Sequence, residues 1–256
     1  MTGDPPRHDV EAAGWNADDA LGDRLSRTCQ AIAEATAAAR RPTGAVRLCA
    51  VSKGHGVDAI RAAHAAGQRD FGESYAGELQ EKAAALADLA DLRWHFVGHL
   101  QRNKMKAVVP HCHLIHGLDS VAGVAAADRV AGGLGRRVDV LLQVNVAGDD
   151  AKSGCAPAEL AALVAAVAAS SHLRLRGLMT IPALEGDPTP AFAALAALLP
   201  VARRALQAAG GRAAADAEAC DELSMGMSDD YGAAIAAGAP IVRVGTAIFG
   251  PRRAAP

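Results

Sequence analysis

The feature that most constrains the fold is a repeated alternation of short apolar runs with helix-length segments. Strands that alternate with helices predict a parallel sheet covered by helices, and eight is the number of strands that closes a (β/α)8 barrel. The chain has eight such runs, and they are Val46–Val51, Arg69–Phe71, Trp94–Val97, Leu114–His116, Val138–Val146, Leu173–Met179, Glu222–Met225 and Ile241–Gly245.

The length of 256 residues suits a single barrel domain. An open doubly wound sheet is the alternative, but no Gly-x-Gly-x-x-Gly follows the first run, which counts against its dinucleotide-binding form. We therefore expect an α/β fold in which residues 16–256 form one TIM barrel with an extra N-terminal helix capped by Asn16, behind a loose tail at residues 1–15. Helices are expected to stop at Gly67 and Gly238, and Pro200 predicts a kink or a break.

Composition and charge exclude several kinds of partner and site. The net charge of −2 includes no basic patch, so neither nucleic acid nor a membrane is expected as a partner. Five scattered cysteines without a Cys-x-x-Cys pair indicate a reducing, cytoplasmic location. The stretch from His111 to His116 resembles a metal site, but neighbours in a strand alternate faces and the ligand set is incomplete, so no metal is expected. Because no long apolar stripe remains exposed, we expect a monomer.

Two charged residues lie where buried strands should be apolar. Lys53 ends the segment Leu48–Lys53, which extends the first run by two residues, and therefore lies at the C-terminal mouth of the barrel, where barrel active sites are found. Burial disfavours an ammonium ion, and a neutral amine can attack an aldehyde to form an imine; a lysine that snorkels to solvent is the alternative. Arg243 interrupts the last run and is predicted to point inward, toward a ligand or a buried acid.

Glycine and hydroxyl residues gather after the last two runs, at 224–228 and 245–250. Barrels often bind phosphate there, on backbone N–H groups at helix starts, although Ser228 could equally be a simple helix cap. His95, His99, Gln143 and Asn145 could line a polar pocket or be hydrogen-bonded in the core. A phosphate-bearing aldehyde fits these features, either pyridoxal 5'-phosphate (PLP) or the substrate of a Schiff-base sugar-phosphate aldolase.

At these same residues the sequence resembles the pyridoxal phosphate homeostasis proteins, the YggS/PROSC family. The resemblance covers nearly the whole chain after the N-terminal tail. The matching segments are Ala50–Lys53, Gly67–Glu73, Trp94–Lys104, Ile115–His116, Asp119–Ser120, Leu142–Asn145, Lys152–Gly154, Arg176–Pro182, Leu223–Asp230 and Val244–Gly250.

The resemblance implies a fold similar to the barrel domain of alanine racemase, standing alone, and a set of cofactor contacts. Lys53 would carry PLP as a Schiff base, Arg243 would face the pyridine nitrogen, and Met225 would line the pocket. The phosphate would be held by Ser228, Gly245 and Thr246.

The chain departs from the family pattern at two positions near the cofactor. Ser74 stands where the family usually has asparagine beside the cofactor, and is expected to make a weaker polar contact. His55 stands two residues after Lys53, where a second lysine is frequent, which puts in doubt any transfer scheme that needs an amine there. Lys152 is a candidate second amine or a surface lysine.

The resemblance implies a non-catalytic carrier or regulator in intracellular PLP homeostasis, with PLP-dependent apo-enzymes as possible recipients. The alternative is a PLP-dependent amino-acid racemase, which needs an acid/base on each face of the substrate carbon. Alanine racemases supply the opposing tyrosine from a second domain. This sequence ends at Pro256, and neither Tyr75 nor Tyr231 is expected over the cofactor. A protein-binding barrel with an empty pocket is a third hypothesis.

Overall fold

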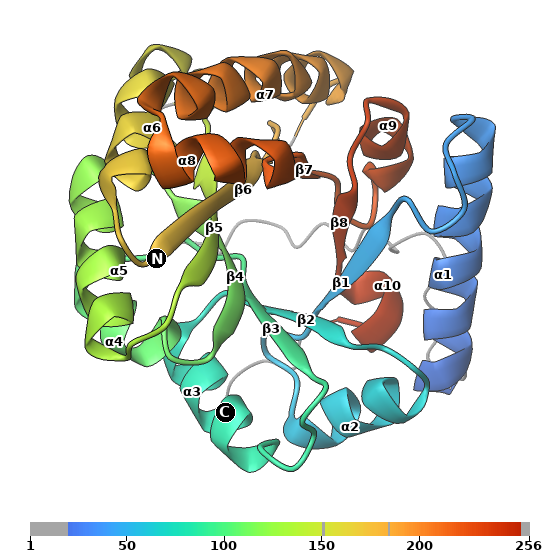
Figure 1. The fold of residues 1–256 in the computed structure, drawn as a ribbon. Coiled ribbons are helices and arrows are strands. Elements are labelled where there is room, and N and C mark those ends of the chain that lie inside the picture. Colours follow the sequence, from blue (N-terminus) through green and yellow to red (C-terminus); the bar gives the residue numbers. More distant parts are fainter. Residues whose placement is uncertain (1–19, 150–151, 184, 252–256) are drawn as a thin grey trace, which may run out of the picture.

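In the computed structural model, eight parallel strands close into a barrel in chain order (Figure 1), and residues 20–149, 152–183 and 185–251 are described. The first strand pairs with both the second and the last, so the predicted barrel is confirmed and the open sheet is wrong. The strands are β1 (Arg47–Val51), β2 (Asp70–Glu73), β3 (Arg93–Phe96), β4 (Cys112–Leu118), β5 (Val138–Gln143), β6 (Leu173–Met179), β7 (Glu222–Ser224) and β8 (Ile241–Val244).

The strand bounds agree with the apolar runs to within a few residues. The predicted and observed bounds of β6 coincide. β4 extends beyond its apolar run at both ends because it pairs along its length with β3 and β5. β5 stops at Gln143 because Val144 makes only an isolated bridge, to Cys155.

Helices form the outer layer around the strands (Figure 1). The extra helix α1 lies against α2, α9 and α10; the Asn16 cap and the predicted tail fall outside the described residues. The helices are α1 (Leu21–Ala38), α2 (Val57–Ala65), α3 (Ala76–Ala85), α4 (Met105–Val108), α5 (Val121–Gly133), α6 (Leu160–Ala169), α7 (Thr189–Ala209), α8 (Gly211–Asp216), α9 (Tyr231–Ala236) and α10 (Thr246–Phe249), with 3-10 turns at Arg102–Lys104, Pro157–Glu159 and Ala217–Ala219.

Two glycines lie just after helices, as predicted, but the proline inside a helix does not divide it. Gly67 and Gly238 both adopt φ +100° just after α2 and α9, which favours glycine. The 21 residues of α7 run through Pro200 without a break, so the predicted division is wrong; Pro200 is exposed, and buried residues pack on both sides of it. By length and composition α7 could span a membrane, but here it lies against α6, α8 and β6.

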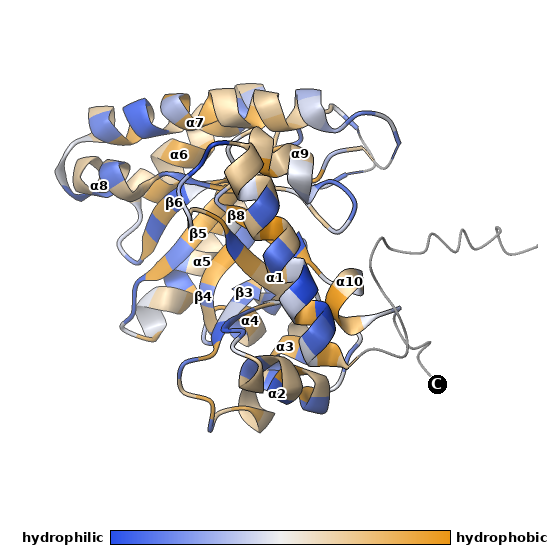
Figure 2. Ribbon diagram, turned by 90° about the vertical axis from the view of Figure 1, so that its right-hand side faces the viewer, coloured by the Kyte–Doolittle hydropathy of each residue, from blue (hydrophilic) through white to orange (hydrophobic). Residues whose placement is uncertain are grey.

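The core has two parts, one between strands and helices and one inside the barrel. Figure 2 shows the apolar residues along the strands and hydrophilic residues interspersed along the outer helices. Side chains from most of the strands form the inner apolar cluster and fill the barrel interior, so the barrel has a packed core rather than a channel. Its members are Cys49, Val51, Val97, Leu114, Leu141, Met179 and Ile241.

Candidate functional site

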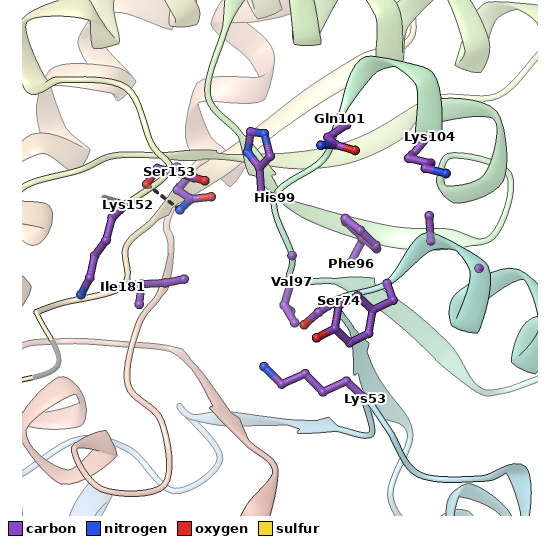
Figure 3. A pocket seen from close by; sticks show the side chains of 15 residues that line it. Lys53, Ser74, Phe96, Val97, His99, Gln101, Lys104, Lys152, Ser153 and Ile181 are labelled. Atoms are coloured by element: carbon purple, nitrogen blue, oxygen red, sulfur yellow. Dashed lines mark hydrogen bonds between the residues drawn. The ribbon is translucent and has the colours of Figure 1, made fainter. Parts of the chain in front are cut away.

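Lys53 lines a cavity of about 740 Å³ at the C-terminal end of the barrel (Figure 3). The cavity is built from segments that follow β1, β2, β3 and β6, together with the end of β5 and the loop after it. Figure 3 shows the Lys53 side chain extending into the space between Ser74 and Ile181. The polar residues that line the cavity are Lys53, Ser74, Tyr75, His99, Gln101, Lys104, Gln143, Lys152 and Ser153.

The cavity carries several cationic or potentially cationic groups. Lys104 and Lys152 line it with Lys53, and the Lys152 ammonium donates a hydrogen bond to the carbonyl of Pro182. His99 also lines the cavity, and its Nδ1 lies 3.2 Å from a carboxylate oxygen of Asp119. This arrangement favours an anionic ligand beside a reactive amine.

Gln143 offers the cavity a buried hydrogen-bond acceptor. The residue is 3% exposed, and its Nε2 donates to the carbonyl of Ser153 at 2.8 Å. Its Oε1 has no partner among the described residues, so a ligand donor could meet it. Of the four polar residues singled out from the sequence, only His99 and Gln143 line this cavity. Asn145 instead bonds within its own loop.

A buried ion pair between Lys82 and Glu73 forms hydrogen bonds to Ser52, at the end of β1. The Lys82 ammonium lies 2.8 Å from Glu73 Oε1 and donates to the carbonyl of Ser52 at 2.9 Å. The Ser52 hydroxyl donates to the same carboxylate oxygen at 2.7 Å. Burial raises the pKa of the Glu73 carboxyl above its ordinary value, while Lys82 and Ser52 oppose that rise. The sequence analysis missed this cluster, although it fixes the residue next to Lys53.

The turn after β7 requires glycine and leaves two N–H groups unpaired. Gly226 has φ +89°, and a Cβ there would lie 2.6 Å from the Cβ of Ala234. The alternative of Ser228 as the cap of α9 is wrong: Asp230 occupies the N-cap position, and its Oδ1 accepts the Met227 N–H at 2.5 Å. Within the described residues, the N–H groups of Ser228 and Asp229 have no hydrogen-bond partner.

The end of β8 lies directly beside the end of β1. A Cβ on Gly245 would lie 3.0 Å from the carbonyl oxygen of Val51, two residues before Lys53, and Thr246 begins α10. Met225 is fully buried, and its N–H donates to the carbonyl of Ile241 at 3.2 Å. Lys53 and Ser74 share the 740 Å³ cavity. The other predicted contacts lie on the adjacent β7–β8 side and are not part of its described lining; they are Met225, Ser228, Arg243, Gly245 and Thr246.

Arg243 points into the barrel, as strand alternation predicts. It is 4% exposed, and it donates to Ser224 Oγ at 2.8 Å and to the carbonyl of Thr180 at 3.0 Å. Burial lowers the pKa of its guanidinium to about 10. No carboxylate of the described chain lies within ion-pair distance, so the alternative of a direct buried salt bridge is wrong.

Two aromatic side chains, those of Tyr75 and His55, belong to the loops around Lys53. Tyr75 lines the cavity with Lys53 and is 53% exposed. The expectation that neither tyrosine lies over the cofactor stays a prediction. It comes directly after Ser74, where the loop leaves β2, and no periodicity marks it. His55 stacks on Phe249 with ring centroids 5.3 Å apart, which joins the β1 loop to α10.

Comparison with known proteins gives consistent matches along most of the chain. Residues 28–253 match the family model described as alanine racemase, N-terminal domain. The chain is 44% identical to the pyridoxal phosphate homeostasis protein of Pseudomonas aeruginosa, over 91% of this chain and 96% of that protein. It is 41% identical to the protein of the same name from Escherichia coli, over 91% and 97%. The structure of PipY from Synechococcus elongatus, solved with PLP bound, is similar with a TM-score of 0.75 and 38% identity, covering 90% of this chain and 100% of PipY.

Proposed function

The chain belongs to the family of pyridoxal phosphate homeostasis proteins, and on that premise we propose that it binds PLP as a Schiff base on Lys53 and holds it in reserve without turning over a substrate. The observation that carries the proposal is the position of Lys53, which lines a cationic cavity next to the ends of β7 and β8.

The residues present suit an anionic aldehyde. The unprotonated Lys53 amine would attack the aldehyde carbon, form a C=N bond and release water. The unpaired N–H groups of Ser228 and Asp229 would donate hydrogen bonds to phosphate oxygens. Gly245 and Thr246, at the start of α10, would contact the same phosphate. Gly226 and Gly245 keep side chains out of the two turns, and Met225 and Ser74 would flank the ligand.

The non-catalytic part of the proposal rests on Arg243. PLP supplies an electron sink when its ring nitrogen is protonated, and a guanidinium facing that nitrogen keeps it unprotonated, which weakens the sink. Arg243 keeps its charge near neutral pH even though burial lowers its pKa to about 10. Storage or delivery of the cofactor to PLP-dependent apo-enzymes therefore suits the site better than carbanion chemistry.

The test is the visible absorption spectrum after the protein is mixed with PLP and desalted. We expect a yellow Schiff-base band in the wild type and its loss in Lys53→Ala. Lys152→Ala removes another amine from the same cavity and is the matched control, which should keep the band. A wild-type protein with no retained band, or a band that survives Lys53→Ala and is lost in Lys152→Ala, would contradict the assignment.

Racemisation is the second candidate because Tyr75 lines the same cavity as Lys53. A racemase would need such a pair of acid/base groups, one on each face of the substrate carbon. The loaded protein is incubated with L-alanine, and D-alanine is measured by chiral chromatography. We expect no D-alanine above a control of free PLP. Formation of D-alanine that is lost in Tyr75→Phe would make the protein an enzyme.

We also propose that the protein acts in the cytoplasm as a monomer. All five cysteines are free, which suits a reducing compartment. The large exposed apolar residues of the described chain form no single stripe: Tyr75 precedes α3, Val121 and Leu134 lie at opposite ends of α5, and Val201 lies in α7. Light scattering after gel filtration should give the mass of one chain, and a dimer mass would refute this part.

A further inference from the structure

A chain of hydrogen bonds crosses the interior of the barrel and ends on Arg243. Asp70 Oδ1 lies 2.8 Å from His95 Nε2, and His95 Nδ1 lies 2.9 Å from His116 Nε2. His116 Nδ1 lies 2.7 Å from Ser224 Oγ, which accepts from Arg243 Nη1 at 2.8 Å. The five residues come from β2, β3, β4, β7 and β8, and each is at most 4% exposed.

When both imidazoles are neutral, the two ends of this hydrogen-bond chain fix the direction of every bond in it. A guanidinium only donates hydrogen bonds, and an ionised carboxylate only accepts them. Asp70 therefore accepts from His95 Nε2–H, which leaves His95 Nδ1 to accept from His116 Nε2–H. His116 Nδ1 then accepts the Ser224 hydroxyl, whose oxygen accepts from Arg243. In this arrangement both imidazoles carry their proton on Nε2.

A protonated histidine would break this pattern. If His95 carried two protons, His116 would donate to Ser224 from Nδ1, Ser224 Oγ would accept from both His116 and Arg243, and the Ser224 hydroxyl would no longer donate to His116. Burial lowers the pKa of His116 well below its ordinary value, and the positive charges of Arg243 and Arg47 lower it further. Burial acts to raise the pKa of the Asp70 carboxyl, but the hydrogen bond from His95 and the charge of Arg93 lower it below its ordinary value.

We propose that Asp70, His95, His116 and Ser224 are positioning residues that fix the orientation and compensate the charge of Arg243 across the barrel. The inference rests on the proposed function in one respect, that Arg243 faces the cofactor ring. Arg243 has only neutral direct partners, a hydroxyl and a carbonyl. A buried charge needs compensation; the carboxylate of Asp230 acts on Arg243 through space, and the Asp70 carboxylate adds to this through the polarised chain.

This arrangement gives a distant residue control over the cofactor site. Asp70 also accepts from Arg93 Nη2 at 2.6 Å, and the Arg93 side chain is 47% exposed. Asparagine at position 70 would keep its carbonyl oxygen on Arg93 and turn its NH2 toward His95. His95 Nε2 would then have to accept, so both imidazoles would carry the proton on Nδ1 instead.

The test is long-range proton–nitrogen NMR of the cofactor-free protein with ¹⁵N-labelled histidine, between pH 5.5 and 8.5. We expect His95 and His116 to show the neutral Nε2–H pattern throughout in the wild type. Asp70→Asn should move both to the Nδ1–H pattern while the circular dichroism spectrum stays native. Titration of His116 within this range overturns the proposal and needs no variant; an unchanged His116 tautomer in folded Asp70→Asn also overturns it.

A matched pair of variants tests whether the hydrogen-bond chain from Asp70 to Arg243 affects the affinity for PLP. His116→Asn removes one member, whereas His113→Asn makes the same change on the same strand at an exposed position. We expect the PLP dissociation constant to rise about fivefold in His116→Asn, the loss of roughly one hydrogen bond, and to stay unchanged in His113→Asn. Equal affinities in folded variants would overturn the positioning role. The tautomers are measured without PLP, so failure there is distinct from failure of the Lys53 absorption test.

Discussion

The buried pair of Lys82 and Glu73 should be a large contributor to the stability of the β1 end. In Lys82→Met the Glu73 carboxylate, which is fully buried, would keep only the Ser52 hydroxyl as a partner. Removal of one partner from a buried ion pair costs about 3–5 kcal/mol. For a domain of this size that corresponds to a fall in Tm of roughly 6–20 °C.

The stability lost in Lys82→Met should decrease as pH falls. Burial already raises the pKa of Glu73, and removal of Lys82 would raise it further. A carboxyl whose pKa is higher in the folded than in the unfolded state destabilises the protein above the folded pKa, and the penalty disappears as pH falls below it. The stability gap between the variant and the wild type should therefore narrow as pH is lowered from 8 toward 5.

The assay is urea unfolding followed by circular dichroism, with two controls. Lys106→Met makes the same change at an exposed position and should alter the free energy of unfolding by less than about 0.5 kcal/mol. The double variant Glu73→Gln, Lys82→Met removes the uncompensated charge and should recover much of the loss. A loss below about 1 kcal/mol in Lys82→Met, or a double variant no more stable than the single one, would refute the reasoning.

Two further predictions concern the turn after β7 and the buried histidine. Gly226→Ala, at φ +89° with its Cβ 2.6 Å from another Cβ, should destabilise the protein by about 1–3 kcal/mol in urea unfolding. Gly232→Ala, where a Cβ meets nothing within 4 Å, should not. His116 stays neutral when folded and is protonated when unfolded below its ordinary pKa of 6.5, so stability falls as pH drops through that value. Between pH 7.5 and 5.5 the wild type should lose about 1.4 kcal/mol more than His116→Asn, and equal losses would contradict this.

The barrel could be predicted from the sequence because buried parallel strands leave a simple pattern. Apolar runs with polar, helical segments between them mark the position of every strand. Arg243 stands out as a charge within the last run, and Lys53 as a charge just after the first. The residues at which the strands begin and end could not be predicted as closely as the positions of the strands. Pairing with neighbours decides them, as in β4, and a run of apolar letters cannot show which residues find a partner.

The buried polar contacts could not be predicted because they join residues far apart in the chain. His116 and Ser224 are 108 residues apart, and only closure of the barrel brings them together. Lys82 looks like an ordinary solvent-facing residue of a polar helix, and its burial follows from how α3 packs on β2. Strand alternation holds within the His111–His116 stretch: His113 is exposed, whereas His116 lies in the barrel interior.

The most direct test of the central claim is reduction of the PLP-loaded protein with borohydride, followed by protease digestion and mass spectrometry. Borohydride converts a C=N bond to a stable secondary amine, so the label stays on the amine that held the cofactor. The account predicts one dominant label, on Lys53, with little on the cavity lysines Lys104 and Lys152. A label spread over surface lysines, or one that falls mainly on Lys152, would contradict it.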